Sequence, residues 1–169
     1  MLKFLCLLFI FAYAEQHTVH FRDFEVFDVK SNPYVNINHA KERPDSSGKT
    51  DINWKTHISR TSHPLKVNYT VYYPQLEKNR SEKVDNLCGV YQEGTTEGNM
   101  QKFLLKVLAN IEKCPIQKGT TYSIPEKFSM FFNSDQKFCG EIEVKFNIFT
   151  EADSDLIISG GSKGTITGC

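Results

Sequence analysis

The chain has 169 residues, with 20 lysines and arginines against 20 aspartates and glutamates, so its formal net charge at pH 7 is zero. A chain of this length is sufficient for one domain with a sizeable hydrophobic core. The even charge balance, with no long basic stripe, argues against a nucleic-acid-binding protein. We therefore expect a partner other than nucleic acid.

Residues 1–14 are typical of a secretory leader. One basic residue, Lys3, precedes an unbroken apolar run that ends in the small-residue pattern Ala12-Tyr13-Ala14. A membrane anchor is the alternative, but the run from Phe4 to Ala14 has only 11 residues, whereas a spanning helix needs about 20. We expect a signal peptide at residues 1–14 and a secreted, extracellular protein with no transmembrane segment. Residues 15–169 are expected to form a single domain.

Apolar and polar residues alternate through the first half of the mature chain, as they do in strands. Thr18–Val29 and Tyr34–His39 are predicted to be extended, although the sequence FEVF at residues 24–27 fills both faces. Asp51–Ser59 and Leu65–Tyr73 alternate cleanly, and the short connection between them is compatible with an antiparallel pair. The apolar face of the former carries Ile52, Trp54, Thr56 and Ile58.

Two sequons, Asn68-Tyr69-Thr70 and Asn79-Arg80-Ser81, match the acceptor pattern for N-linked glycosylation. In the alternation of Leu65–Tyr73, Asn68 falls on the polar face, which is where a glycan requires it. We therefore expect glycans at Asn68 and Asn79, on the surface of a secreted protein.

One segment, Asn99–Lys113, has the spacing of an amphipathic helix. Asn99 is the expected N-cap, and Pro115 predicts that the helix stops at about Lys113. The apolar face of such a helix needs a sheet to pack on. It consists of Met100, Phe103, Leu104, Val107, Leu108 and Ile111.

The C-terminal third contains further strands. The sequence EKFSMFFNS places Phe128, Met130 and Phe132 on one face, and CGEIEVKFNIFTE gives the clearest alternation in the chain. The tail DLIISGGSKGTITGC is predicted to form two short strands around a glycine-rich turn. These strands favour a mainly β fold, an antiparallel sandwich or barrel with one amphipathic helix. The inward residues of the clearest strand are expected to be Ile142, Val144, Phe146 and Ile148.

The sequence gives little support for a catalytic site. Gly160–Gly164 fits the G-x-S-x-G pattern of hydrolases, but that motif needs an acid and then a histidine later in the chain. Only five residues follow Gly164, and the last histidine is His63. A glycine-rich turn is therefore the favoured interpretation of Ser162 and its neighbours, and we expect no enzyme, no cofactor and no metal site.

The cysteines indicate disulfides. Cys6 leaves with the leader, and four cysteines remain in a chain directed to an oxidising compartment. No C-x-x-C pair or Cys/His cluster supports metal ligation. Four cysteines allow three connectivities, and spacing alone does not choose among them. The four are Cys88, Cys114, Cys139 and Cys169.

A longer pattern is built around these cysteines. Cys88 is followed by 25 residues that contain the predicted helix, then by CPIQKGTTY at residues 114–122, an alternating strand from Cys139 to Phe149 and a terminal Cys169. This arrangement resembles the ML-like lipid-recognition superfamily, including insect chemosensory B proteins and relatives similar to the ganglioside activator. The resemblance covers about half of the chain. The residues that carry it are Cys88, Cys114, Pro115, Lys118, Gly119 and Tyr122.

The resemblance implies a β-cup or immunoglobulin-like sandwich that binds a lipid or other hydrophobic molecule without catalysis. It also implies a Cys88–Cys114 bridge. The ganglioside activator ties an N-terminal cysteine to its C-terminal region, but this mature chain has none before Cys88, which leaves Cys139 to pair with Cys169. A role in chemosensory signalling, with a membrane receptor as a further partner, follows from the same resemblance.

Our leading hypothesis is a secreted carrier with a hydrophobic ligand between its sheets. The alternative is an extracellular protein–protein interaction module with a solid core, which the absence of a cavity of about 300 Å³ or more would favour. The residues expected to line the ligand cavity are Ile52, Trp54, Ile58, Leu104, Leu108, Phe128, Met130, Phe132, Ile142, Val144 and Phe146.

Overall fold

The computed structural model describes residues 16–28, 32–40, 49–125, 127–133, 138–150 and 155–169. The predicted signal peptide at residues 1–14 lies outside these residues. Within the described residues, strands form two antiparallel sheets and one segment forms an α-helix. No helix in these ranges has the length and apolar character that crossing a membrane requires.

The larger sheet has the strand order β5-β4-β8-β9-β1-β7, and the smaller sheet has the order β2-β3-β6. A short 3₁₀ helix, η1 (Pro74–Leu76), joins β4 to β5. The large sheet consists of β1 (Gln16–Asp28), β4 (Leu65–Tyr73), β5 (Lys78–Val84), β7 (Lys127–Asn133), β8 (Gly140–Thr150) and β9 (Leu156–Thr167). The small sheet consists of β2 (Val35–Ala40), β3 (Lys49–Trp54) and β6 (Thr121–Ile124).

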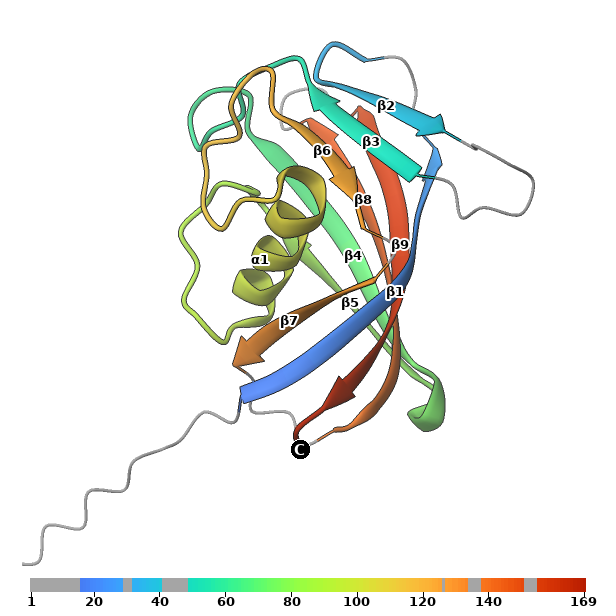
Figure 1. The fold of residues 1–169 in the computed structure, drawn as a ribbon. Helices are drawn as coiled ribbons and strands as arrows, with labels where there is room; N and C mark the ends of the chain where they lie inside the picture. Colours follow the sequence, from blue (N-terminus) through green and yellow to red (C-terminus); the bar gives the residue numbers. More distant parts are fainter. Residues whose placement is uncertain (1–15, 29–31, 41–48, 126, 134–137, 151–154) are drawn as a thin grey trace, which may run out of the picture.

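Figure 1 shows the large sheet curving around the helix α1 (Thr96–Ala109), with the small sheet beside the helix on the same, concave side. The core lies between these layers. The predicted fold class, a mainly β sandwich or cup with one amphipathic helix, is confirmed for the described residues.

The alternation of the large sheet decides which side chains enter the core. β4 and β8 pair antiparallel with Tyr69 opposite Phe146 and Val71 opposite Val144, so the apolar faces of both strands coincide. Burying each large apolar side chain contributes about 1.5–3 kcal/mol. The inward positions of β8 are all buried: Ile142, Val144, Phe146 and Ile148.

The helix begins and ends earlier than the sequence predicts. Its N-cap is Thr95, whose hydroxyl accepts a hydrogen bond from the Gly98 N–H, and not Asn99. Its last residue is Ala109 because Asn110 adopts a left-handed conformation with φ 53°, and the Asn110 N–H closes the final turn. Pro115 therefore does not set the end of the helix, since Asn110 has already done so.

The predicted strand Asp51–Ser59 ends at Trp54, and Ile58 forms an isolated bridge with Ile116 instead. The expected pair between this segment and Leu65–Tyr73 is wrong, because β3 pairs with β2 and β6 whereas β4 pairs with β5 and β8. Alternation identifies a strand and its buried face, but it does not identify the neighbour.

The predicted glycine-rich turn in the tail is also wrong, because β9 runs unbroken through Gly160–Gly164. Packing against neighbouring strands explains why glycines occupy these positions. A Cβ on Gly160 would meet Phe146 Cζ at 2.8 Å and the Glu25 carbonyl oxygen at 2.9 Å. One on Gly164 would meet Phe21 Cδ1 at 3.2 Å. The absent side chains of β9 leave room for aromatic rings from the neighbouring strands.

β1 carries two register shifts against β9, between Arg22 and Glu25 and between Val26 and Asp28. Each leaves one extra residue in β1, as a β-bulge does, and Asp23 in the first has φ 52°. Up to Phe21, the odd-numbered residues face the core, whereas after the first shift Phe24 and Val26 pack against it. The first shift therefore moves the inward positions of β1 from odd-numbered to even-numbered residues.

Both predicted disulfides are confirmed, Cys88–Cys114 with Cα atoms 5.5 Å apart and Cys139–Cys169 with Cα atoms 5.8 Å apart. The first joins the segments that flank α1, and it closes a loop of 26 residues. By the chain-entropy estimate, such a loop contributes about 3 kcal/mol to stability. The peptide bond between Cys114 and Pro115 is cis.

Candidate functional site: a pocket between the sheet and the helix

A partly enclosed cavity of about 130 Å³ lies between the inner face of the large sheet and the N-terminal half of α1. Its walls come from β1, β4, β7, β8, β9 and the helix, so residues from both ends of the chain meet there. The apolar lining consists of Val19, Phe21, Val71, Met100, Phe103, Phe132, Phe138, Ile142, Val144 and Ile166. The remaining lining residues are His17, Tyr69, Tyr73, Gly94, Thr96 and Asn99.

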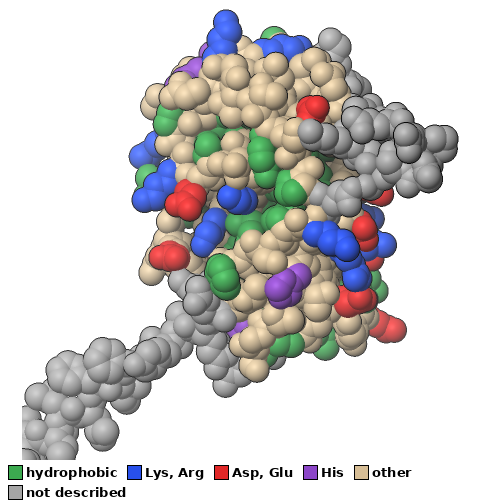
Figure 2. Space-filling view, viewed as in Figure 1, with side chains coloured by type: hydrophobic (Ala, Val, Ile, Leu, Met, Phe, Trp, Pro, Cys, Tyr) green, Lys and Arg blue, Asp and Glu red, His purple; other side chains and the backbone are tan. Residues whose placement is uncertain are grey.

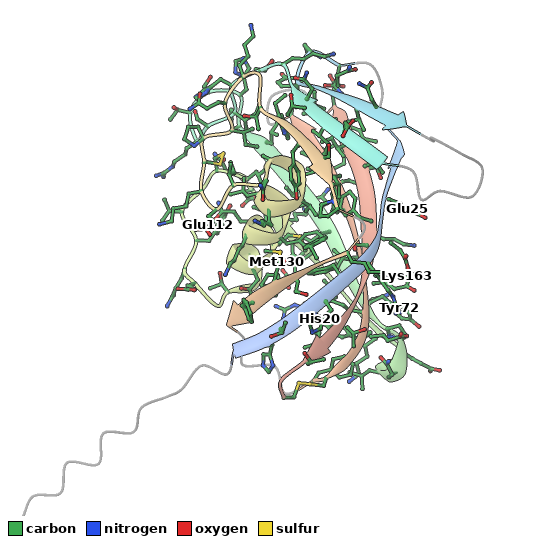
Figure 3. All side chains as sticks on the ribbon, viewed as in Figure 1. His20, Glu25, Tyr72, Glu112, Met130 and Lys163 are labelled. Carbon is green, nitrogen blue, oxygen red and sulfur yellow. A yellow bond between two sulfur atoms is a disulfide. The ribbon has the colours of Figure 1, made fainter. Side chains whose placement is uncertain are left out.

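The surface around this region is mixed in character. Figure 2 shows hydrophobic side chains in the middle of the face where α1 and β7 meet, with lysines, arginines and acidic residues around them. In Figure 3, Met130 lies on β7 beside the helix, where it is buried, whereas His20 lies on β1 and is exposed. Met130 therefore belongs to the core, whereas His20 lies on the outward face of the sheet.

Aromatic rings pack beside the pocket. Phe21 lies with its ring centroid 4.7 Å from that of Phe103 and 5.0 Å from that of Phe128. Phe103 in turn meets Phe146 edge-on, with the centroids 6.3 Å apart. Such contacts add about 0.5–1.5 kcal/mol each beyond simple burial. They fix the apolar wall that Phe21 and Phe103 present to the cavity.

Three of the residues expected to contact a ligand, Phe132, Ile142 and Val144, line the pocket. Three others occupy the same inner face without lining it: Phe128, Met130 and Phe146. The remaining five are fully buried and pack elsewhere in the core: Ile52, Trp54, Ile58, Leu104 and Leu108. Ligand contact for the first three stays a prediction.

The five outlying residues pack into the solid part of the core, towards the C-terminal end of α1. There the Trp54 indole N–H donates a 2.9 Å hydrogen bond to the Leu108 carbonyl oxygen. The sequence correctly indicated that the helix contributes to the apolar interior. It did not indicate that the helix borders the cavity at Met100 and Phe103 and not at Leu104 and Leu108.

Sequence reasoning missed the contribution of β1 and β4 to the pocket. The alternation of Leu65–Tyr73 placed Tyr69, Val71 and Tyr73 on the inward face, and that signal could have added them to the lining residues. The alternate residues His17, Val19 and Phe21 carried a similar but weaker signal. Helix geometry and sheet curvature, which no local pattern specifies, decide which of these inward residues border empty space.

Two of the lining residues each carry a buried polar atom that has no hydrogen-bond partner within the described structure: the Tyr69 hydroxyl oxygen and His17 Nε2. Tyr69 is 3% exposed. Burial, and secondarily the charges of Glu82 and Glu97, raises the pKa of the Tyr69 hydroxyl well above its usual range, so this group is a neutral donor at physiological pH.

Ser162, the residue of the hydrolase-like motif, is not a free nucleophile. It is 5% exposed in the middle of β9, and its hydroxyl donates a 2.9 Å hydrogen bond to the Arg22 carbonyl oxygen at the β1 bulge. The hydroxyl thus serves to satisfy the bulged backbone. Among the described residues, no group of three or more His, Cys, Asp or Glu side chains is placed to hold a metal ion.

The outward face of the large sheet has wider but polar hollows. One of them, about 440 Å³, is lined mainly by polar and charged residues of β4, β5 and β8 and includes Asn68. Asn68 and Asn79 are both exposed, in positions that a glycan can reach. The inner pocket is smaller, but aromatic and aliphatic residues make up most of its lining, whereas polar and charged residues make up most of the lining of this depression.

No protein-family model matches the chain, and no curated protein matches it in sequence. Among solved structures, the chain is similar to a Niemann-Pick type C2 protein from Japanese carpenter ant, with 11% identical residues and a TM-score of 0.35. The match covers 83% of this chain and 96% of that chain.

Proposed function

We propose that the protein is a secreted carrier that holds a small hydrophobic molecule in the pocket between the large sheet and α1. The apolar cavity lined by Phe21, Phe103 and Ile142 is the observation that carries this proposal. Ligand sites are concave and mostly apolar, with a few polar groups that orient the ligand. This pocket has both features.

The volume restricts the ligand. An apolar cavity of about 150 Å³ holds a molecule the size of benzene, and this pocket measures about 130 Å³. A one-ring molecule or a short hydrocarbon chain therefore fits as the pocket stands. A lipid would place only part of one tail inside, with the rest leaving through the open side.

We further propose membership of the ML-like superfamily. The bridges Cys88–Cys114 and Cys139–Cys169 support it, since both were expected from that resemblance. Secretion after cleavage at Ala14, glycans on Asn68 and Asn79, delivery to a membrane receptor and a chemosensory role belong to the same proposal. A non-enzymatic role agrees with the position of Ser162 inside β9.

The second candidate is an extracellular interaction module whose core is solid and whose surface binds another protein. The cavity volume favours it, because about 130 Å³ is below the roughly 300 Å³ at which small-molecule sites begin. This candidate predicts a protein that is isolated empty and binds no small apolar probe.

Native mass spectrometry of protein secreted by cultured cells separates the two candidates, and it also reports the mature N-terminus and the glycans. Binding is then measured with cyclohexane and with fluorescent fatty-acid and sterol probes. A carrier binds at least one of them, and Val71→Trp, which fills the pocket, abolishes that binding. The matched control is Val90→Trp at a valine that is 84% exposed and outside the pocket. An empty protein that binds no probe would overturn the carrier proposal.

A further inference from the structure

We propose that the ligand carries a neutral oxygen function, such as a hydroxyl or carbonyl group, which accepts a hydrogen bond from the Tyr69 hydroxyl, and that His17 Nε2 is a second polar contact that accepts from a ligand hydroxyl. This inference rests on the proposed function. It adds the chemical class of the ligand: an oxygenated small molecule and not a pure hydrocarbon or a carboxylate.

The first support is the missing partner of Tyr69. Tyr69 lines the apolar pocket, and its hydroxyl is buried and makes no hydrogen bond within the described structure. A buried polar group without a partner costs free energy, and most such groups in folded proteins are paired. A ligand in the pocket with an acceptor oxygen would supply the partner.

The hydrogen-bonding role of His17 Nε2 follows from the contact that the other ring nitrogen makes. Its Nδ1 lies 3.7 Å from Cys169 Sγ. A disulfide sulfur carries no hydrogen, so Nδ1 must be the donor in this contact. In a neutral imidazole the other nitrogen is then an acceptor. Nε2 is buried without a partner and suits a ligand hydroxyl.

The charges around Tyr69 select against an anionic ligand. Glu82 lies opposite Tyr69 on β5, and Glu97 is in the first turn of α1. Arg80 pairs with Glu82 at 2.8 Å and offsets that carboxylate, whereas Glu97 has no ion pair shorter than 4.0 Å within the described residues. A carboxylate beside Tyr69 would meet this negative charge, and the repulsion between like charges disfavours it.

A series of six-membered-ring probes tests these assignments in the full secreted chain: cyclohexane, cyclohexanone, cyclohexanol and cyclohexanecarboxylate. Affinities are measured by NMR titration for wild type, Tyr69→Phe and His17→Phe, and each probe is compared between proteins to cancel its own hydration. Tyr69→Phe is expected to weaken cyclohexanone and cyclohexanol by roughly three- to tenfold and to leave cyclohexane unchanged. His17→Phe is expected to weaken cyclohexanol alone.

A control variant and a stability measurement separate a ligand contact from a structural one. Tyr91→Phe makes the same chemical change outside the pocket, where the Tyr91 hydroxyl donates to the Asn86 carbonyl at 3.0 Å and accepts from its N–H at 3.2 Å. It is expected to lower the melting temperature of the empty protein without changing probe binding. Tyr69→Phe is expected to keep or raise that temperature, because it removes an unpaired group.

The outcomes are distinguishable. If cyclohexane binds but Tyr69→Phe affects all probes equally, the oxygen assignment is wrong and the carrier proposal stands. The same conclusion follows if Tyr69→Phe destabilises the empty protein as Tyr91→Phe does, or if Tyr69→Phe weakens cyclohexanecarboxylate as much as it weakens cyclohexanol. If no probe binds, both proposals are overturned.

Discussion

The two ends of α1 face the same core but differ in how that core is filled. At the C-terminal end, Leu108 is fully buried, and its carbonyl oxygen accepts the Trp54 indole N–H. Towards the N-terminal end, Met100 borders a cavity that reaches Phe103 in the middle of the helix. One amphipathic stripe thus produces a solid core at one end and a pocket at the other. The comparison teaches that apolar periodicity specifies burial but not whether the buried volume is filled.

The strongest test of this comparison truncates the helix at its two ends. Leu108→Ala is expected to lower the free energy of unfolding by about 3–5 kcal/mol, because a cavity opens in a filled region. Met100→Ala is expected to cost about 2 kcal/mol, because Met100 already borders empty space. Urea denaturation measures both. Equal losses would mean that the two ends are packed alike.

The disulfides offer the next test. Replacing Cys88 and Cys114 by serine is expected to lower the free energy of unfolding by about 3 kcal/mol through the larger entropy of the unfolded chain. Probe binding should stay unchanged, since neither residue lines the pocket.

Replacing Cys139 and Cys169 instead should cost a similar amount and also alter binding of cyclohexanol, because Cys169 contacts His17. Denaturation and NMR titration of both double variants decide the matter. A loss of probe binding in the variant that lacks Cys88 and Cys114 would contradict the assignment of the pocket, because neither residue lines it.

A substitution in β9 tests the boundary between the two ends. Gly160→Ala is expected to destabilise the protein by about 1–3 kcal/mol, since its Cβ would collide with the Phe146 ring and the Glu25 carbonyl oxygen. In a Phe146→Leu background the added cost should be smaller, because one of the two collisions is relieved. A thermal-denaturation cycle over the four proteins measures the coupling, and strict additivity would show that the ring does not contact Gly160.

The smallest expected effect is on alkaline stability. The pKa of Tyr69 is raised in the folded protein, above the usual value near 10 that holds in the unfolded chain. As the pH rises past 10, the unfolded chain therefore loses this proton first, and stability falls by at most about 1.4 kcal/mol per pH unit. Tyr69→Phe removes this contribution. Urea titrations between pH 8 and 11 compare the slopes, and identical slopes would show that the hydroxyl is already solvated.

The sequence predicted the inner faces better than their arrangement. Phe128, Met130, Phe132 and the inward positions of β8 were identified correctly, because a half-buried strand must alternate. The pairing of β3 and the continuity of β9 were not, since both depend on distant segments. In β9, the glycines resembled a turn only because the rings of Phe146 and Phe21, which occupy the space above them, lie elsewhere in the chain.

The site was less predictable than the fold. Phe132, Ile142 and Val144 border the cavity and Trp54 does not, yet all four read as inward apolar residues of strands. The difference comes from where α1 crosses the sheet, and the helix is itself displaced from its predicted bounds by Thr95 and Asn110. The caps are set by residues next to them in the sequence, but they also decide which helical residues lie over the sheet and border the cavity.

The extra residue at Asp23 in β1 has a consequence for how such a site can change. Removing it would leave Phe21, Phe24 and Val26 in one regular alternation, so every inward side chain of the strand would keep its face. The strand would lose a bend, since a bulge bends the strand that carries it. The curvature of the pocket wall therefore depends partly on the number of residues in β1. A single codon gained or lost in β1 could reshape the site without replacing any residue that lines it.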